Sequence, residues 1–448
     1  MRTFLFIVVL TTLFGCEKDE ILNIPTDVKK ETIVTSVATS NLTTYSVTVD
    51  VPNITPQQVS LSAYHVSAMT HYENNGSEYI LLSANTSPSV PMIQLKKTNG
   101  SWGYLKNYPE ATMGVGRNYE FVNGGVVYSD HGLEGGDPSD MGVLFYGKFN
   151  KDDIQWKRIT VGDGKSFYHS VSAGDLNSDG TTDFIGLHMG IKNHDWGDPL
   201  HTFTQNVDGS IVENRNIISF EGMNMYGGGG AVLVKDLFGD GKPEIVQAEY
   251  GSREPWGEKR YGFVVFGYVD GKYKKIFELG KQGIYSIADR GATSIKASDF
   301  NKDGKVDLAI ALEGSNEDTY IQVFLNDGNN GFKPADLLEF TGDELQFREF
   351  NLIDYDDDGD MDITLNPFHA YKIYPNKFRI SKESGIFLHH LIWRNDNTKF
   401  SKLTTEIRIN GIKPDYLKGY KINGVFKFIG LESNGSNTFK VHEIVPKF

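Results

Sequence analysis

The chain has a single cysteine, Cys16, which excludes an internal disulfide framework and a metal site built from cysteines. It also lacks the short motifs of several enzyme classes. There is no Gly-x-Ser-x-Gly nucleophile elbow, no Walker phosphate loop, no dinucleotide-binding Gly-x-Gly-x-x-Gly sequence and no His-Glu-x-x-His helix. Basic residues are fewer than acidic residues, and the net charge is -14. This balance excludes a general affinity for nucleic acid or for anionic membrane surfaces.

The N-terminus has the pattern of a secretory leader. Residues 1–15 have a basic start at Arg2, continue with a short apolar core and end with a small residue, Gly15, before Cys16. The segment is too short to stay in a membrane as a spanning helix. Leu13-Phe-Gly-Cys16 resembles a bacterial lipobox, which implies cleavage before Cys16 and a lipid anchor on its thiol. The acidic Glu17-Lys-Asp-Glu20 that follows resembles the export signal of surface lipoproteins in Bacteroidota. We therefore expect a secreted lipoprotein at the outer membrane or cell surface of a Gram-negative bacterium.

One nine-residue motif occurs four times and organises the rest of the chain. It places oxygen-bearing side chains at positions 1, 3 and 5, glycine at position 6 and an acid at position 9. Alternating oxygen ligands followed by a sharp turn at glycine suit a hard cation, and Ca²⁺ is the expected ion. The acid at position 9, rather than 12, and the strand-like flanks exclude a helix–loop–helix calcium hand. The copies begin at Asp175, Asp236, Asp299 and Asp354.

The predicted Ca²⁺ ligands are the polar residues at positions 1, 3, 5 and 9 of each copy. The second copy has Phe238 at position 3 and so lacks one ligand. Asp/Gly-rich hairpin turns that bind no metal are the alternative interpretation. The ligands are Asp175, Asn177, Asp179, Asp183, Asp236, Asp240, Glu244, Asp299, Asn301, Asp303, Asp307, Asp354, Asp356, Asp358 and Asp362.

These four loops resemble the FG-GAP or VCBS-type repeat of integrin-like β-propellers, in which a calcium loop joins the first two strands of each blade. The loops recur at intervals of about 60 residues, the length of a four-stranded blade with long loops. Hairpins without the acids extend the repeat, and the blades are centred near residues 70, 120, 175, 236, 299, 354 and 420. We therefore predict an all-β fold, a seven-bladed β-propeller, with six or eight blades left open.

The expected organisation follows from this count. Residues 1–15 form the lipoprotein signal peptide, residues 16–54 form a tether and a first strand that could close the ring, and residues 55–448 form the propeller. A closed ring leaves no exposed sheet edge. The far ends of the strands that flank each calcium loop should meet around the central opening of the opposite face. The residues about six before and thirteen after each first loop Asp fall there, because a strand rises about 3.3 Å per residue.

Histidine, tyrosine and arginine concentrate at these positions. This set suits β-elimination of a uronate polysaccharide, in which a cation neutralises the carboxylate and His or Tyr moves the protons. Together with the predicted propeller, the chain order His, His, Tyr, Arg resembles the ulvan lyases, which cleave a sulfated algal polysaccharide. The resemblance implies catalytic roles for His169, His188, Tyr250 and Arg260, with Arg253 an alternative to Arg260. The predicted substrate-binding residues are His131, Arg253, Arg290, Arg348 and His369.

Two functions remain open on the sequence alone. The first is a surface-anchored polysaccharide lyase that acts on an anionic, uronate-containing, ulvan-like polysaccharide. The second is a non-catalytic propeller lipoprotein that binds glycan or protein, because the same fold carries many functions. The polar character of the predicted opening favours the lyase.

Overall fold

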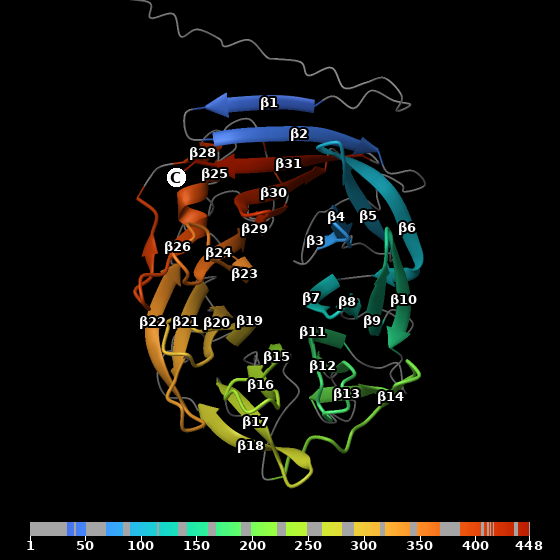
Figure 1. The fold of residues 1–448 in the computed structure, drawn as a ribbon, viewed down its shortest axis with the longest axis vertical. Coiled ribbons are helices and arrows are strands. Elements are labelled where there is room, and N and C mark those ends of the chain that lie inside the picture. The colour runs from blue at the N-terminus through green and yellow to red at the C-terminus, as the bar shows by residue number, and fades with distance from the viewer. Residues whose placement is uncertain are drawn as a thin grey trace, which may run out of the picture.

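Seven sheets stand around one axis (Figure 1). A computed structural model describes residues 34–39, 42–50, 69–83, 90–113, 116–132, 141–159, 167–189, 199–221, 230–248, 262–279, 291–313, 319–340, 347–367, 386–404, 407–409, 412, 414, 416–433 and 438–447. These residues form six four-stranded sheets, one five-stranded sheet and one additional strand pair. The prediction of an all-β, seven-bladed β-propeller is confirmed.

The blades are numbered here in chain order, and within each blade the strands run from the axis outward. Blade 1 contains β3 (Met69–Asn74), β4 (Ser77–Leu82), β5 (Val90–Thr98) and β6 (Ser101–Met113); blade 2 contains β7 (Gly116–Val122), β8 (Gly125–Gly132), β9 (Met141–Asn150) and β10 (Asp153–Ile159); blade 3 contains β11 (Phe167–Gly174), β12 (Asp183–Met189), β13 (Leu200–Gln205) and β14 (Ile211–Glu213). Blade 4 contains β15 (Ala231–Lys235), β16 (Glu244–Ala248), β17 (Phe263–Val269) and β18 (Lys272–Leu279); blade 5 contains β19 (Gly291–Ser298), β20 (Asp307–Glu313), β21 (Thr319–Asn326) and β22 (Phe332–Phe340).

The last two blades depart from this regular order. Blade 6 contains β23 (Phe347–Ile353), β24 (Asp362–Pro367), β26 (Ile392–Arg394) and β27 (Ser401–Lys402), and beside it lie the pair β25 (Ile386–Phe387) and β28 (Arg408–Ile409) and the 3-10 turn η3 (Leu388–Leu391). Blade 7 takes strands from both ends of the described chain. Its order is β29 (Tyr416–Ile422), β30 (Val425–Ser433), β31 (Thr438–Pro446), β2 (Leu42–Asp50) and β1 (Val34–Thr39).

The second strand of a blade is its most buried element. Every residue of β16 and β20 is buried, including acids and a glutamine as well as the aliphatic side chains. Neighbouring blades pack face to face, so a second strand contacts protein on both of its faces and reads as a continuous apolar run. The core is therefore divided into clusters that lie between consecutive blades.

Several blade hairpins turn through two residues with positive φ. Asn75-Gly76 has φ values of 49° and 73°, and Asn423-Gly424 has values of 51° and 74°. These values are those of a type I′ turn, whose twist matches that of the two flanking strands. Asn-Gly hairpins thus replace the acidic loops in blades 1 and 7, as the repeat predicts.

An N-terminal strand completes the ring. β2 pairs antiparallel with β31 along its whole length, from Leu42 opposite Pro446 to Asp50 opposite Thr438. Leu42, Val47 and Val49 are buried by this pairing and by the neighbouring blades. The ring is closed by hydrogen bonds between the two ends of the described chain.

A network of charges joins blade 7 to blade 1 across this closure. Lys97 Nζ lies 2.7 Å from Glu443 Oε1, and Lys427 Nζ lies 3.1 Å from Glu78 Oε2. The Trp102 indole donates a hydrogen bond of 2.9 Å to Glu443. Although burial acts to raise the pKa of Glu78, its hydrogen-bonded and cationic partners lower it to about 2. The Glu78 carboxylate therefore stays ionised except at strongly acidic pH, and it links the first blade to the last through its ion pair with Lys427.

No helix among the described residues is long and apolar enough to cross a membrane. The predicted signal peptide and the lipid anchor at Cys16 lie outside the described residues, and both stay predictions.

Candidate functional site

Blade 3 brings two predicted catalytic histidines to one end of a hairpin. The backbone of Tyr168 in β11 pairs with that of His188 in β12, and the pairing shifts between Tyr168 and Ser170. His169 is the extra residue at this β-bulge. His169 and His188 thus lie at the ends of β11 and β12 that are farthest from the acidic loop that begins at Asp175. The offsets of six before and thirteen after the loop Asp place both residues at the expected end of the blade.

The bulge recurs in other innermost strands. Pairing shifts between Gly116 and Asn118 in β7, between Ala292 and Ser294 in β19, and between Phe347 and Glu349 in β23. The extra residues are Arg117, Thr293 and Arg348. A bulge redirects the side chain of the inserted residue and is common near functional sites. The sequence periodicity predicts the position of this ring of residues, but it carries no signal for the bulge.

For three other predicted catalytic and substrate-binding residues, His131, His188 and Arg348, the structure describes the backbone only. In blade 5, Thr293 rather than Arg290 occupies the position equivalent to His169. The predicted residues outside the described part of the chain are Tyr250, Arg253, Arg260, Arg290 and His369.

The four acidic loops share one backbone conformation at the opposite ends of these strands. Position 6 is a glycine with φ between 82° and 85° in every copy. Position 4 also has positive φ, although three of the four residues there are not glycine. These residues are Ser178 (60°), Gly239 (71°), Lys302 (58°) and Asp357 (61°). The second loop adopts this shape despite Phe238, so the backbone conformation does not depend on a full set of ligands.

Hydrogen bonds from the backbone to the first and last acids hold this shape. The glycine N–H at position 6 donates to the carboxylate at position 1 at 2.9, 2.9, 2.8 and 3.2 Å in chain order. The acid at position 9 accepts the N–H of position 2 at 2.8 to 3.0 Å. In blades 3, 5 and 6 its second oxygen accepts an N–H at the end of the third strand or just beyond it, from Gln205, Asn326 or Asn395. Position 9 therefore fastens the loop to its blade.

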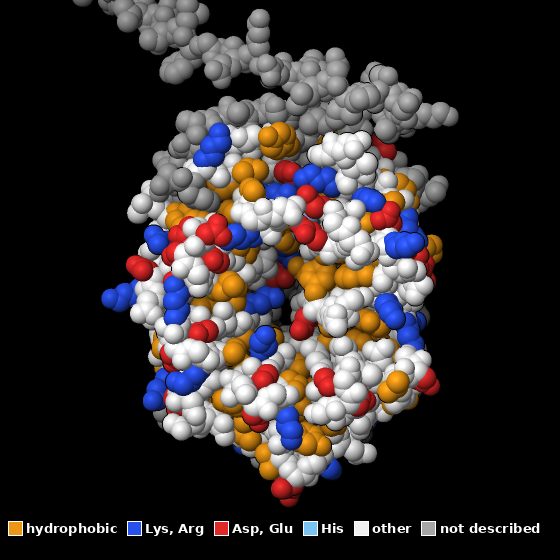
Figure 2. All heavy atoms as spheres, viewed as in Figure 1, with side chains coloured by type: hydrophobic (Ala, Val, Ile, Leu, Met, Phe, Trp, Pro, Cys, Tyr) orange, Lys and Arg blue, Asp and Glu red, His pale blue; other side chains and the backbone are white. Residues whose placement is uncertain are grey.

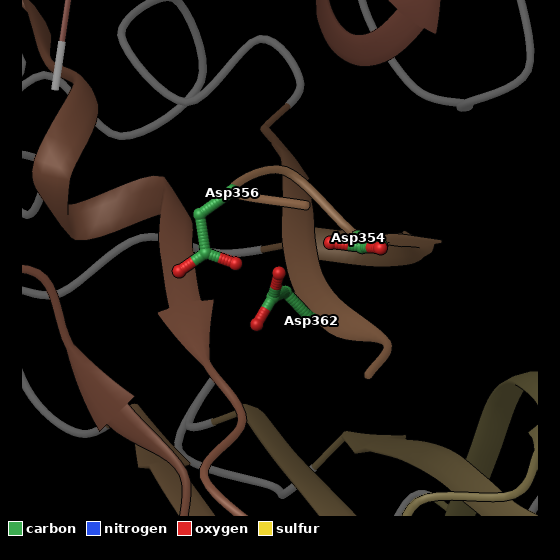
Figure 3. Close-up of side chains that lie close together, drawn as sticks. All are labelled: Asp354, Asp356 and Asp362. Atoms are coloured by element: carbon green, nitrogen blue, oxygen red, sulfur yellow. The ribbon is translucent and has the colours of Figure 1, made fainter. Parts of the chain in front are cut away.

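The fourth loop brings three carboxylates together (Figure 3). Asp354, Asp356 and Asp362 each offer an oxygen within 4.8 Å of the other two. The Oδ1 atom of Asp354 is buried and accepts no hydrogen bond. Arg394 lies 3.2 Å from Asp356 Oδ2 and donates a hydrogen bond of 3.1 Å to Asp358, and Lys421 Nζ lies 4.0 Å from Asp354 Oδ1. The three clustered carboxylates therefore have two cationic side chains beside them, and a bound cation would stabilise the cluster further.

The acids at position 9 resist ionisation. Burial raises the pKa of Asp183 to about 6 and the pKa of both Glu244 and Asp362 to about 7, and other loop carboxylates raise these values further. A bound cation would reverse this effect, because it favours the charged form. The loops thus have the donor chemistry that Ca²⁺ requires, and the fourth loop has a carboxylate at every ligand position.

A central cavity of about 660 Å³ lies along the axis, lined by the innermost strands of all seven blades. Its lining extends along these strands, from Asn118 beside the bulge of β7 and Val171 within β11 to Lys235 and Asp354 at the acidic loops. In the view of Figure 2 the centre of the molecule is hollowed, and basic and acidic side chains both surround the opening. Lys235, Lys296 and Lys421 contribute positive charge, and Glu120 and Asp354 contribute carboxyl groups.

A buried ion pair lies beside this cavity. Lys418 in β29 is fully buried and its Nζ lies 2.6 Å from Glu349 Oε2 in β23. Lys418 also donates a hydrogen bond of 3.0 Å to the Tyr119 hydroxyl in β7. Burial lowers the pKa of Lys418, and Glu349 acts against this change. The pair connects blades 2, 6 and 7 across the axis.

Sequence reasoning missed these axial residues. A signal was present, because Glu120 and Lys296 interrupt short apolar runs within innermost strands. Burial raises the pKa of Glu120 to about 7, while Ser172 and the nearby lysines lower it. A carboxyl group of this kind is half protonated near neutral pH and can both donate and accept hydrogen bonds.

Comparisons with known proteins agree with the repeat. The family model for the FG-GAP-like repeat matches residues 299–365, which run from the third acidic loop into β24. The chain is a seven-bladed β-propeller with an FG-GAP-like repeat. No curated protein matches it.

Several solved structures align with this propeller at low identity. A protein from Lactobacillus plantarum is 12% identical with a TM-score of 0.43, and the alignment covers 74% of this chain and 82% of that one. The periplasmic gluconolactonase PpgL of Pseudomonas aeruginosa is 13% identical with a TM-score of 0.47, covering 83% and 98%. The sialidase of Trypanosoma rangeli is 10% identical with a TM-score of 0.41, covering 86% and 60%. These values are too low to transfer any activity.

Proposed function

We propose that this propeller is a polysaccharide lyase that cleaves a uronate-containing, ulvan-like polysaccharide by β-elimination. One observation carries the proposal: the β11–β12 pairing sets His169 and His188 at the same end of blade 3. The matching bulges set Arg117 and Arg348 at the equivalent ends of blades 2 and 6. Histidines and arginines at matching ends of several blades are the residue types that elimination beside a carboxylate needs.

The reaction breaks one C–H and one C–O bond. A basic side chain of the set His169, His188 and Tyr250 removes the proton from the carbon that bears the uronate carboxylate. The electron pair forms a double bond to the neighbouring carbon, and the glycosidic C–O bond on that carbon breaks. A second member of the set protonates the departing oxygen. Arg260 neutralises the carboxylate, which makes its neighbouring proton more acidic, and no further reactant is consumed.

The catalytic prediction concerns four single variants. His169→Ala, His188→Ala and Tyr250→Phe should each lower kcat by about 10²–10⁴-fold, because each removes a proton-transfer group. Arg260→Ala should raise KM as well as lower kcat, since its charge meets the substrate before and during the reaction. The measurement is the absorbance of unsaturated uronate ends formed from ulvan.

The matched control is Thr293→Ala, at the equivalent bulge of blade 5, where no ionisable group is present. It should keep full activity. Every variant must melt at the temperature of the parent protein, so that lost activity is not lost structure. Full activity in all four variants would disprove the site. A parent protein without activity on any uronate polysaccharide would disprove the lyase and leave glycan or protein binding.

We further propose that the acidic loops bind Ca²⁺, with the fourth loop as the strongest site. Asp354, Asp356 and Asp362 would hold the ion, which would neutralise their mutual repulsion. The second loop, which has Phe238 in place of a ligand, would bind more weakly. The role is structural, because the loops lie at the strand ends opposite His169 and His188.

Removal of calcium should lower the melting temperature. An ion that binds only the folded state at a hundred times its Kd stabilises that state by about 2.7 kcal/mol. Asp356→Asn should reduce the shift between chelator and millimolar Ca²⁺. Asp357→Asn is the control, because it removes a charge from the same loop while its side chain points to Lys421 at 2.5 Å. Identical melting in chelator and in Ca²⁺ would show that the loops are turns without metal.

A further inference from the structure

The lining of the central cavity contains three lysines and two carboxyl groups, so positive charge is in excess there. Lys421 is engaged by Asp357 at 2.5 Å and by the Asp354 carbonyl oxygen. Lys418 is engaged by Glu349 at 2.6 Å. Lys296 and Lys235 line the cavity from β19 and β15, and both interact electrostatically with the carboxyl group of Glu120 in the same lining. Two ammonium groups share this one carboxyl group, so an anionic ligand would add a second negative partner for them.

An apolar surface lies against the same cavity. Phe121 is 40% exposed and Met361 is 37% exposed, and both line it. The Phe121 ring rests on Tyr119 with 5.6 Å between ring centroids and on Phe149 with 6.4 Å. This packing holds one aromatic side chain in place while part of its surface stays exposed. A fixed, partly exposed aromatic side chain beside polar groups is typical of small-molecule sites.

Hydrogen-bonding groups complete the lining. Glu120 and Tyr420 both contribute to it. The Tyr420 hydroxyl accepts the His71 N–H at 3.2 Å and is also hydrogen-bonded to Tyr119, and these two contacts fix its orientation. A ligand at this site would therefore meet cations, a hydroxyl, a carboxyl group and an aromatic ring within one cavity.

The lining selects among ligand classes. A divalent cation is disfavoured by the lysines, and an apolar ligand would take those lysines and Glu120 out of water without offering them a polar group. A nucleic acid strand needs an extended basic groove, whereas this site is a single cavity of about 660 Å³. That volume is within the range of about 300–1,000 Å³ that is usual for small-molecule sites. An acid group, several hydroxyls and one apolar ring face are the features that the lining complements.

We infer that the central cavity is a binding site for a small acidic sugar, whose carboxylate or sulfate group meets Lys296 and Lys235 and whose ring packs on Phe121. The lining includes Lys235, Asp354 and Lys421, which lie at or next to the strand ends that carry the acidic loops and Asn-Gly turns. The inference does not require the proposed lyase activity.

The test is calorimetric titration of the full chain with four probes. Glucuronate and glucose 6-sulfate distinguish a carboxylate from a sulfate, glucose lacks the acid group, and inorganic sulfate lacks the sugar. We expect saturable binding of at least one acidic sugar, at least about 10-fold tighter than glucose, because a charge-assisted hydrogen bond contributes about that much. Inorganic sulfate should bind more weakly than the acidic sugar.

Two variants locate the site. Lys296→Gln should weaken binding of the acidic sugar by about 10-fold or more, and Phe121→Ala should weaken binding of the sugar without changing that of inorganic sulfate. Lys272→Gln, on the outer strand of blade 4, is the matched control and should bind like the parent.

Three results would overturn the inference. They are no saturable binding of either acidic sugar, inorganic sulfate binding as tightly as the sugars, or unchanged binding in a Lys296→Gln protein that melts like the parent.

Discussion

Removal of residues 1–50 is expected to abolish the cooperative unfolding transition of the propeller. The deletion removes β2, whose nine residues pair with β31 and complete blade 7. Leu42, Val47 and Val49 lose their buried positions, and a buried side chain of this size contributes about 1.5–3 kcal/mol. The sum is comparable with the whole stability of a typical domain, about 5–15 kcal/mol. The deletion would also leave β31 as an unpaired edge that can pair with other molecules.

The measurement is differential scanning calorimetry of two shortened chains. A chain that begins at Leu42 lacks β1 but keeps β2, and should melt nearly like the parent. A chain that begins at Val51 should show no cooperative transition or should aggregate. Adding a peptide of residues 42–50 should restore part of the transition, because it can pair with β31 without a covalent link. Equal melting of the two shortened chains would contradict the role of β2 in closing the ring.

Lys418→Met is expected to destabilise the protein by about 3–5 kcal/mol, because it leaves the carboxylate of Glu349 buried without its cation. It also removes the donor that reaches the Tyr119 hydroxyl at 3.0 Å. The loss should appear in urea-induced unfolding as a lower midpoint with an unchanged slope. Three blades contribute to this cluster, so its loss should weaken the ring as a whole.

Two controls separate the buried charge from the loss of one lysine. Lys274→Met breaks the exposed pair with Asp270 at 2.9 Å and should cost less than about 1 kcal/mol. The double variant Lys418→Met, Glu349→Leu removes both charges and should recover most of the lost stability, because an apolar pair needs no compensation for buried charge. A Lys418→Met protein as stable as Lys274→Met would show that the ion pair contributes little.

Features that depend on short stretches of sequence were predictable. The acidic loops are encoded by alternating oxygen side chains and one glycine, all within nine residues, and Asn-Gly encodes the turns of blades 1 and 7. The regular spacing of these signals predicts the number of blades, because each blade is one repeat of similar length. The offsets from the loops also place His169 and His188, because a strand has a fixed rise per residue.

Conformation at position 4 of the loops could not be predicted from residue type. Ser178, Lys302 and Asp357 have positive φ, which is unfavourable for such side chains in isolation. The hydrogen bonds of the first acid to the backbone of the same loop compensate for this cost. The bulge at His169 also could not be predicted from residue type, because it depends on how β11 pairs with β12 rather than on the histidine itself.

The sequence by itself determined the class of fold and the position of each acidic loop and favoured seven blades over six or eight, because these features depend on local patterns repeated at a similar interval. Only the tertiary structure decided which residues meet at the axis. Tyr119, Glu349 and Lys418 come from three blades, and Glu120 faces lysines that lie far away in the chain. Their contacts arise because closing the ring brings seven innermost strands together, and no local pattern encodes which side chains then face one another.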